Sequence, residues 1–599
     1  MTNFQIKEQD VLVIGAGGAG LRASIEAAAQ GASVGLVCKS LLGKAHTVMA
    51  EGGMAAALRN VDERDSWKVH FRDTMRGGKM LSHWRMAQIH AQEAPDRVKE
   101  LEGWGALFDR TKDGKILQRN FGGHQYPRLA HVGDRTGLEL IRTLQDHAIH
   151  CGIDVHMECT IYKLFKENGK ICGALGYYRT TGEFIFFKAK SVIIATGGIG
   201  KSFRVTSNSW EYTGDGQALA LETGADLIDM EFIQFHPTGM VWPLSVKGTL
   251  VTEGVRGEGG ILKNSKGERF MFHYVPDMFK GEFAESEEEC KRWLAGDKNA
   301  RRPPELLTRD VVAKAIHAEV KAGRGSPHGG AFLDIATQRT EEEIKKKLPS
   351  MYHQFKELGN IDITKEAMEV GPTCHYIMGG IAVDPETQET SVPGLFAAGE
   401  CASGLHGANR LGGNSLSDLI VFGRRAGLYA AQHSKKIISS FATPQNEIEQ
   451  AIHEALEPFE RKTGENPFTV MEDLQETMEA HAGIVREEES LVEGLKKLEI
   501  LKKRVPTVKV DGDRTYNGGW HTALDLKNMV IVSECLARAA LARKESRGGH
   551  TRIDFPRSEE KFGKLKHILR KRHDTIELVT TPVPEMPDEL KKIIEGDVA

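Results

Sequence analysis

Three short apolar runs along the chain have the pattern of buried strands. The first, residues 11–14, leads into a glycine-rich turn and a helical stretch that ends near Gly31, and a strand pattern returns at residues 33–37. The other runs, residues 191–195 and 394–398, also lead into glycines. Short, uniformly apolar runs are typical of strands buried on both faces of a sheet. The pattern predicts one α/β sheet whose strands come from separated parts of the chain.

A loop-rich insertion with its own strand and helix patterns separates the second and third apolar runs. We expect it to form a capping domain of α+β type at residues 238–360. The sheet domain would then comprise residues 1–237 and 361–432, because the third apolar run belongs to the same sheet.

The spacing of apolar residues changes after residue 432. Apolar residues recur at helical spacing, for example at Ile448, Ile452 and Ala455, and we expect a helical domain over residues 433–551. The last segment, residues 552–599, combines prolines with scattered charges. It is predicted to form an extended tail that packs on the body or on a partner.

The composition excludes several classes of function. The 599-residue chain has a net charge of −4, so no global attraction to nucleic acid is expected. Its eight cysteines include no C-x-x-C pair, which argues against an iron–sulfur cluster or a structural zinc within this chain. Scattered thiols are typical of a reducing compartment. The sequence contains no run of 18 apolar residues and no signal-peptide pattern, so no membrane span is expected.

The turn after the first strand has the form of a dinucleotide-binding motif. Residues 15–20 spell G-A-G-G-A-G between a strand and a helix, the context that G-x-G-x-x-G requires. In NAD enzymes an acidic residue at the end of the second strand binds the ribose. Here Cys38, Lys39 and Ser40 occupy that point, which favours FAD over NAD. The glycines after residue 195 and the acidic residue Glu400 are further candidates for contacts with so extended a ligand.

The segment after the second strand is more specific. Residues 43–53 spell G-K-A-H-T-V-M-A-E-G-G. This segment resembles the flavin-attachment segment of succinate dehydrogenase and fumarate reductase flavoproteins. Further segments resemble that family in the family's own order, at residues 213–216, 234–239, 250–260, 309–313, 372–376, 406–416 and 544–550. The tail beyond them does not resemble the better-known members.

The resemblance implies a fold and a cofactor. The implied fold is an α/β FAD-binding Rossmann-like domain with an inserted α+β capping domain, followed by a helical domain and an extended C-terminal tail. His46 would bond covalently to the 8α carbon of FAD. The implied FAD-binding residues are Gly15, Ala16, Gly17, Gly18, Ala19, Gly20, Cys38, Lys39, Ser40, His46, Thr47, Ala50, Gly52, Gly53, Thr196, Gly197, Asp215, Glu400, Ser415 and Leu416.

The family interconverts succinate and fumarate, which are dianions that need several cationic or hydrogen-bonding groups once they leave water. The implied substrate-binding residues are His236, Thr252, His375 and Arg410, and the implied proton-transfer residues are Arg309, Glu253 and Arg256. A guanidinium, whose pKa exceeds about 12, is a poor proton donor. Arg309 could act only if its proton is lost transiently in a dry site, with Glu253 and Arg256 as the relay to solvent. The alternative is that Arg309 forms an ion pair with Asp310 at the start of a helix.

The same resemblance implies partners. Electrons would pass to an iron–sulfur protein subunit, and through it to membrane anchor subunits and quinone. The chain would then be peripheral, on the cytoplasmic face of the cell membrane.

Three alternatives remain open at this point. L-aspartate oxidase shares the fold and many segments, but it binds FAD non-covalently and lacks a histidine at the position of His46. A free-standing soluble fumarate reductase usually carries its own redox domain or lacks the helical region. A flavin-carrying scaffold without turnover would not need the complete dicarboxylate set, and an assay with succinate and an artificial dye would separate it.

Overall fold

The computed structural model describes residues 4–297, 299–438 and 441–596, and its centre is a seven-stranded sheet. The strand order is β6–β2–β1–β9–β8–β7, and β16 also pairs with β9. Strands β6, β2, β1, β9 and β16 are parallel to one another, whereas β8 is antiparallel to β9 and β7 is antiparallel to β8. Their bounds are β1 (Phe4–Ile14), β2 (Val34–Val37), β6 (Asp154–His156), β7 (Cys159–Glu167), β8 (Lys170–Tyr178), β9 (Phe184–Ile194) and β16 (Leu395–Ala397).

The three apolar runs predicted as strands lie side by side in this sheet, which confirms the α/β fold class. Val13 pairs with Ile193, and Phe396 pairs with Ile193 from the other side. The first strand begins at Phe4 rather than at Val11, because the polar residues before the apolar run continue the pairing with β9.

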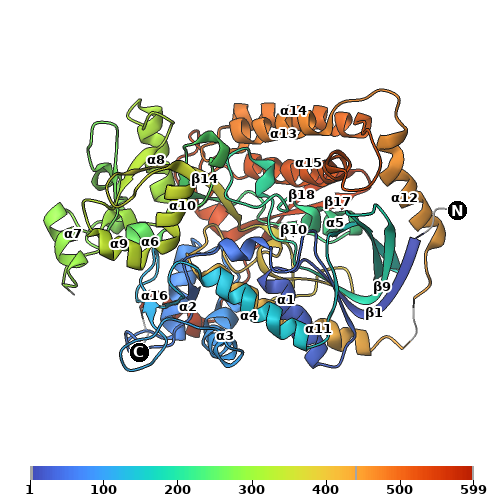
Figure 1. The fold of residues 1–599 in the computed structure, drawn as a ribbon, viewed down its shortest axis with the longest axis horizontal. Helices are drawn as coiled ribbons and strands as arrows, with labels where there is room; N and C mark the ends of the chain where they lie inside the picture. The colour runs from blue at the N-terminus through green and yellow to red at the C-terminus, as the bar shows by residue number, and fades with distance from the viewer. Residues whose placement is uncertain (1–3, 298, 439–440, 597–599) are drawn as a thin grey trace.

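Successive residues of β1 point to two different cores, as the alternation of a strand requires. Val11 and Val13 pack against the layer of helices at the bottom of Figure 1, whereas Leu12 and Ile14 pack toward the opposite face. The helices of this layer are α1 (Gly18–Ala29), α2 (Trp67–Gly77), α3 (Trp84–Gly103), α4 (Thr136–His150) and α11 (Asn414–Lys435).

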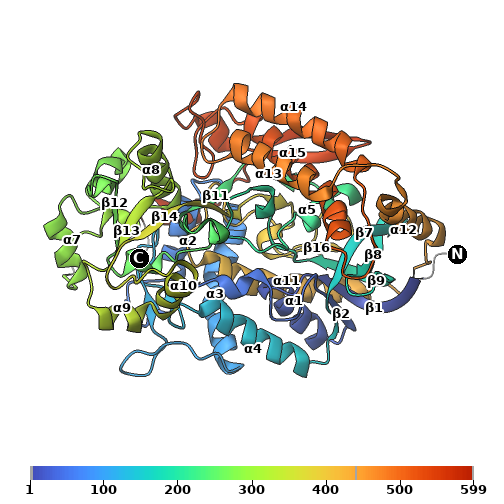
Figure 2. The same ribbon diagram turned by 45° about the horizontal axis from the view of Figure 1, so that its top comes forward.

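The inserted segment forms a unit with its own apolar core, at the left of Figures 1 and 2. Its sheet has the order β11–β14–β13–β12, with β11 (Ile233–Met240), β14 (Met368–Ile377), β13 (Ala331–Asp334) and β12 (Ile261–Lys263). The helices are α6 (Gly254–Gly257), α7 (Glu287–Leu294), α8 (Arg309–Lys321), α9 (Glu341–Lys347) and α10 (Pro349–Gly359). The chain enters this unit along β11 and leaves it along β14, so two neighbouring strands connect it to the main body.

The predicted helical region forms four long helices over the other face of the main sheet, at the top of Figure 1. They are α12 (Gln445–Glu460), α13 (Pro467–Ala482), α14 (Glu488–Arg504) and α15 (Gly518–Ala542). The stripe of Ile448, Ile452 and Ala455 is buried, as its spacing predicted. Helix α15 packs on the short helix α5 (Asp215–Thr223), which joins this region to the main body.

The last segment differs from the expected extended tail. Strands β17 (Leu565–Arg572) and β18 (Thr575–Pro582) form a hairpin that extends a sheet with β10 (Leu227–Ile228) and β15 (Gly380–Ile381), and helix α16 (Asp588–Glu595) packs on α2. The charges of the hairpin concealed the strand pattern. Lys566 is buried because it pairs with Asp229 at 2.6 Å, and Arg570 pairs with Asp226 at 2.5 Å.

None of the helices in the described part of the chain is long and apolar enough to cross a membrane.

Candidate active site

One large cavity lies between the glycine-rich turn of β1, the start of α11 and the inserted unit. It encloses about 1550 Å³ of empty space, part of it open to solvent. The predicted residues that line it are Gly15, Ala16, Gly17, Gly18, Ala19, Cys38, Lys39, Ser40, His46, Thr47, Ala50, Gly52, Gly53, Thr196, Gly197, Asp215, His236, Thr252, Glu253, Arg309, His375, Glu400, Arg410, Ser415 and Leu416. The structure thus brings the predicted cofactor and substrate residues to one cavity.

Two predicted residues lie behind the cavity wall. A Cβ atom on Gly20 would meet the carbonyl oxygen of Gly15 at 1.7 Å, so this glycine allows α1 to pack closely against its own turn. Arg256 is fully buried and contacts Glu253 rather than the cavity.

The turn between β1 and α1 is shaped for close approach of a ligand to the backbone. Gly15 has a φ of 108°, and a Cβ atom there would lie 2.3 Å from the carbonyl oxygen of Ala195. Gly17 precedes α1 in extended backbone and provides no side-chain cap. The amide of Gly18 donates to Oγ1 of Thr47 over 3.2 Å. A helix N-terminus that begins with glycines on a cavity wall fits the pyrophosphate of FAD.

Lys39 lines the cavity, but its ammonium group is already paired. It donates to Asp215 over 2.9 Å and to Asp525 of α15 over 2.8 Å. Asp215, at the start of α5, thus lies beside the end of β2, and Asn528 of α15 donates to the same carboxylate over 3.1 Å. The sequence analysis missed Asp525 and Asn528, since no local pattern links them to a segment almost 500 positions earlier.

His46 lies on a short 3-10 turn, η1 (His46–Met49), and is half-buried on the wall of the cavity. Its Nε2 atom is 3.3 Å from Nδ2 of Asn208, and its ring packs edge-on against Tyr212 with centroids 4.8 Å apart. Burial lowers the pKa of His46 to about 4, so the imidazole is neutral and keeps a lone pair. Its Nδ1 atom is buried and has no hydrogen-bond partner among the described residues. A buried nitrogen without a partner on the cavity wall fits a residue that contacts a ligand.

The loop after His46 is fixed from outside the cavity. Arg119 of β4 (Gln118–Arg119) donates to the carbonyl oxygens of Gly52 and Glu51 over 2.7 and 2.6 Å. Glu51 also lines the cavity, and burial raises the pKa of its carboxyl well above the usual range. The sequence analysis missed Glu51, although it stands directly before the two predicted glycines.

Two arginines from different segments meet at one amide oxygen. Nη1 of Arg309 and Nη2 of Arg410 donate to Oε1 of Gln234 over 3.2 and 3.0 Å. Burial, followed by the charge of Arg309, lowers the pKa of Arg410 to about 10. Nε of Arg410 is buried without a hydrogen-bond partner in the described part of the chain. Two cations are thus held close together in a desolvated place, and an anion placed between them would relieve their repulsion.

Gln234 was not predicted, although it stands two residues before His236 in a segment that was. Residues two apart in a strand share a face, so this spacing was a usable signal.

Two neutral histidines stand beside these arginines. The rings of His236 and His375 lie edge to face with centroids 5.1 Å apart. Burial lowers the pKa of both imidazoles well below the usual range, and Arg309 adds to this at His236. Nδ1 of His375 is 2.9 Å from Oγ of Ser207, which fixes its ring. Together with Thr252 they provide polar groups that can bind a carboxylate.

The predicted relay residues form a continuous line of contacts. Nε of Arg309 donates to Oε2 of Glu253 over 2.9 Å, and Nη2 of Arg256 lies 3.6 Å from the same oxygen. Burial alone would raise the pKa of Glu253, but Arg309 and Arg256 outweigh it and hold the pKa below its usual range. Arg256 then donates to the carbonyl oxygen of Glu305 in the interior.

The ion pair proposed as the alternative role of Arg309 is replaced by other partners. Asp310 accepts a hydrogen bond from Asn409 over 3.4 Å and lies 3.9 Å from the ammonium group of Lys314. Arg309 itself points to Glu253 and Gln234, on the cavity wall.

Comparisons with known proteins agree with this geometry. A sequence model described as FAD binding domain matches residues 10–416, and one described as fumarate reductase flavoprotein C-term matches residues 471–591. The chain is 43% identical to one subunit of the fumarate reductase (CoM/CoB) of Methanothermobacter marburgensis, over 95% of this chain and 98% of that one. It is 38% identical to the succinate dehydrogenase flavoprotein subunit of Coxiella burnetii, over 95% of each chain.

Solved structures of related proteins have the same fold. The fold matches a chain of Mycobacterium smegmatis Sdh1 in complex with UQ1 with a TM-score of 0.84 and 58% identity, over 98% of this chain and 95% of that one. It matches a chain of E. coli quinol fumarate reductase with a TM-score of 0.89 and 33% identity, over 98% of each chain.

Proposed function

This chain belongs to the family of succinate dehydrogenase and fumarate reductase flavoprotein subunits, and we propose that its cavity binds FAD beside a C4 dicarboxylate and interconverts succinate and fumarate. The observation that carries this proposal is the pair of buried arginines at Gln234, because Glu253 pairs with Arg309 while Nε of Arg410 has no partner in the described part of the chain, so an anion in the cavity would compensate the second charge. The residues around the glycine turn fit FAD. The named relatives, which are succinate dehydrogenase and fumarate reductase flavoprotein subunits, favour this function over the aspartate oxidase alternative.

The dicarboxylate is held by groups that come from different segments. Arg410 would bind one carboxylate through its unpaired Nε atom, with His375 and His236 beside it. Thr252, directly before Glu253, would bind the other. Since Arg410 lies on the main body and Thr252 on the inserted unit, the substrate would be gripped from both sides, and a twist between its two ends would polarise the central bond.

The reaction removes a hydride from one central carbon of succinate and a proton from the other, and fumarate forms with its new double bond. Bound FAD supplies the two-electron acceptor, or the donor in reverse. Arg309 would carry the proton, since its guanidinium reaches the cavity and Glu253 accepts from its Nε atom. Glu253, which accepts from the same guanidinium, would pass a proton from solvent to Arg309, so that the loss of the Arg309 proton is only transient.

We further propose that His46 attaches FAD covalently. The neutral imidazole, its buried nitrogen without a partner and its place on the cavity wall support this role. Denatured protein should keep the mass of one FAD and its yellow fluorescence. In His46→Ser the flavin should dissociate on acid precipitation, and succinate oxidation should fall more than fumarate reduction. Complete loss of flavin from the denatured wild-type chain would contradict the attachment.

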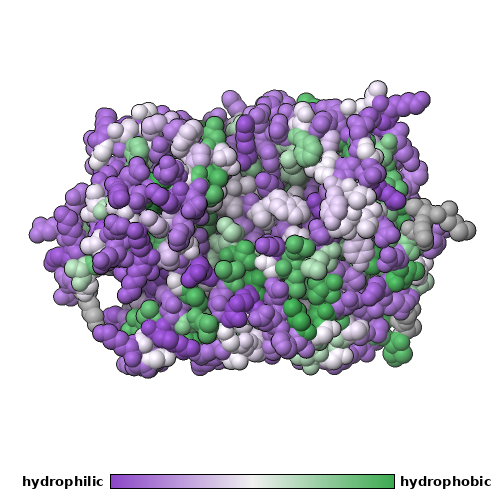
Figure 3. Space-filling model, in the orientation of Figure 1, coloured by the Kyte–Doolittle hydropathy of each residue, from purple (hydrophilic) through white to green (hydrophobic). Residues whose placement is uncertain are grey.

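The partner of this chain would cover an apolar surface near His46. Leu41, Met49 and Leu138 are 47%, 40% and 51% exposed, and Leu41 and Met49 also line the cavity. Figure 3 shows apolar side chains gathered in the middle of the face on which α1 and α4 lie in Figure 1. We propose that an iron–sulfur subunit binds here and leads electrons to membrane anchor subunits and quinone, with this chain on the cytoplasmic face of the membrane.

The test is direct. The purified chain should reduce an artificial dye with succinate, and malonate, an unreactive dianion, should compete. From membranes it should co-purify with a cysteine-rich iron–sulfur protein. No turnover with succinate or fumarate in a chain that is folded and loaded with flavin would overturn the function, whereas isolation as a soluble chain that reduces quinone alone would overturn only the partners.

A further inference from the structure

A turn in the C-terminal part of the chain contacts the segments of both substrate-side arginines. Residues 545–550 follow α15, and the amide of Gly549 donates to the carbonyl oxygen of Ala408 over 2.8 Å. Ala408 stands two residues before Arg410. On its other side the turn accepts a hydrogen bond from Lys314 at the carbonyl oxygen of Gly548 over 3.4 Å. Lys314 lies on α8, the helix that begins at Arg309.

The turn packs tightly against these neighbours, and neither of its two glycines has room for a Cβ atom. A Cβ atom on Gly548, whose φ is 55°, would lie 2.3 Å from the carbonyl oxygen of Ala408. A Cβ atom on Gly549 would lie 2.6 Å from the carbonyl oxygen of Ile233, the first residue of β11. Because β11 carries Gln234 one residue later, a displacement of the turn would reach the amide oxygen that the two arginines share.

One buried carboxylate holds the turn in shape. Oε1 of Glu545 accepts from Arg543 and Arg547 over 3.0 and 2.8 Å, and Oε2 accepts from Arg547 and the amide of Glu559 over 3.0 and 2.8 Å. These four donors match the acceptor capacity of a carboxylate. Arg547 continues to the carbonyl oxygen of Lys79 over 3.3 Å, and the neighbouring Gly78 accepts from the amide of Ala408 over 2.9 Å.

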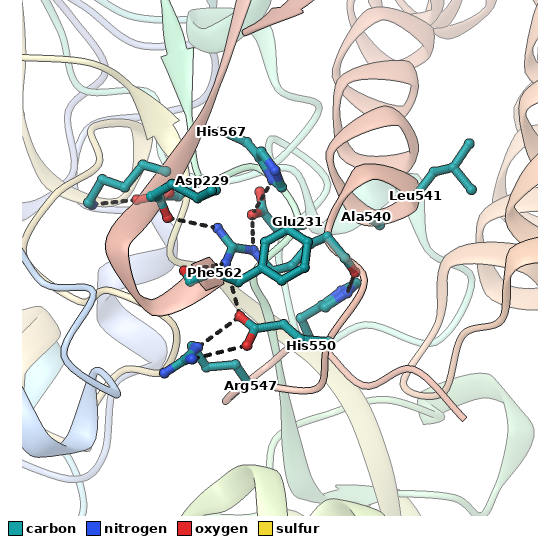
Figure 4. Close-up of polar contacts among 12 residues, drawn as sticks. Asp229, Glu231, Ala540, Leu541, Arg547, His550, Phe562 and His567 are labelled. Atoms are coloured by element: carbon teal, nitrogen blue, oxygen red, sulfur yellow. Dashed lines mark hydrogen bonds and ion pairs between the residues drawn. The ribbon is translucent and has the colours of Figure 1, made fainter. Parts of the chain in front are cut away.

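Arg543 ties this carboxylate to the rest of the fold. Its Nε atom donates to Glu231 over 2.6 Å, and Nδ1 of His567, on the C-terminal hairpin, lies 3.0 Å from the same oxygen. Figure 4 shows Glu231 and His567 on one side of this cluster and Arg547 on the other. Glu231 stands two residues before Ile233, so the cluster also holds the approach to β11.

We propose that Glu545 is a positioning residue for the reaction. Fixed by Arg543 and Arg547, it holds the turn at residues 545–550, and the turn sets the distance between the loop of Arg410 and the helix of Arg309. This inference rests on the proposed function, because it assumes that the two arginines act on one dicarboxylate.

The experiment compares Glu545→Gln with a matched control, Glu319→Gln, in the full-length, flavin-loaded chain. Glu319 is also a buried carboxylate, and it pairs with Nε and Nη2 of Arg324 over 2.9 and 2.7 Å near the far end of α8. Turnover per bound flavin, the Kd of malonate from the flavin absorbance, and the thermal unfolding midpoint would be measured. Both variants should lower the midpoint. Only Glu545→Gln should weaken malonate binding, by roughly three- to thirtyfold, and lower kcat per flavin.

A second variant keeps all charges. Gly549→Ala should give the same combined change in malonate Kd and kcat, since its new methyl group pushes on β11. It also decides the question if Glu545→Gln does not fold. Wild-type values per flavin in Glu545→Gln or, failing that, in Gly549→Ala would overturn the inference. So would an equal loss of malonate affinity in Glu319→Gln. If the wild-type chain neither binds malonate nor oxidises succinate, the proposed function itself fails.

Discussion

Two clusters of buried arginines in this protein differ in how their charges are compensated. In the cavity cluster, Arg309 and Arg410 are 8% and 3% exposed and share one amide oxygen; Arg309 pairs with the carboxylate of Glu253, whereas Nε of Arg410 has no partner among the described residues. In the C-terminal cluster, Arg543 is fully buried and donates to the carboxylates of Glu231 and Glu545.

This difference distinguishes arginines that bind a ligand from arginines that stabilise the fold. A buried cation is tolerated when carboxylates surround it, and such a group holds segments together. A buried cation that faces a second cation across a cavity is unfavourable until an anion arrives. Removal of an arginine should therefore impair function first in the cavity cluster and stability first in the C-terminal cluster.

The largest effect is expected at Arg309. Arg309→Gln removes the proposed proton carrier, so turnover should fall by at least the ~10²–10⁴-fold that is typical of lost acid–base catalysis, in both directions. Flavin should stay bound, and malonate should still bind, because Arg410 and the two histidines remain. Steady-state rates per flavin and a malonate titration measure this.

Retention of more than about a tenth of wild-type turnover would fall short of an acid–base loss and would move the proton carrier to another residue. A variant that is mainly less stable, with normal turnover per flavin, would show that Arg309 stabilises the fold and does not carry the proton.

The next effect concerns stability. Arg543→Met leaves the carboxylate of Glu231 buried without its arginine and removes one of the two arginines of Glu545, which should destabilise the fold by about 3–5 kcal/mol. The thermal unfolding midpoint of the ligand-free protein measures it. An unchanged midpoint would show that this cluster contributes no net stability, and the contrast between the two clusters would fail.

Arg410→Ala should behave in the opposite way. It removes one of two repelling cations, so the ligand-free midpoint should stay close to that of the wild type. Malonate affinity should fall by about 2–5 kcal/mol, because one buried carboxylate of the ligand loses its partner. Unchanged malonate affinity would contradict the assignment of Arg410 as a substrate ligand.

The sequence predicted the parts of this molecule that carry local patterns. The strands at Val11, Ser191 and Leu395 are continuous apolar runs, and the helix at Ile448 repeats every 3.6 residues, so each is visible in a short window. Segments that resemble a known family likewise pointed to residues that meet at one cavity.

The parts that could not be predicted depend on partners distant in the sequence. Asp525 faces Lys39 only after α15 has packed on α5. The hairpin at residues 565–582 contains buried charges whose neutralising aspartates lie more than 300 positions earlier, so its composition resembled that of a solvated tail. No local sequence pattern indicates the Asp525–Lys39 contact or the burial of the hairpin charges.

The last effect is a pH dependence that both clusters share. Burial lowers the pKa of His236 and His375 in the cavity, and of His550 beside the C-terminal cluster, well below the usual range. These imidazoles are neutral in the folded chain but bind protons in the unfolded chain below about pH 6.5. The unfolded state then binds more protons, so stability is fully present above that pH and declines as the pH falls.

Each fully buried histidine should weaken stability by up to about 1.4 kcal/mol per pH unit below that point. The thermal unfolding midpoint of the ligand-free protein should therefore be nearly constant from pH 8 to 7 and should fall from pH 6.5 to 5. Saturating malonate should reduce this fall, because a dianion beside His236 and His375 favours their protonated forms, whereas His550 is paired within the fold and does not respond. A fall that malonate leaves unchanged would place the sensitive histidines outside the cavity. A constant midpoint down to pH 5 would mean that none of the three imidazoles is buried in its neutral form, and the electrostatic contrast between the clusters would need a different basis.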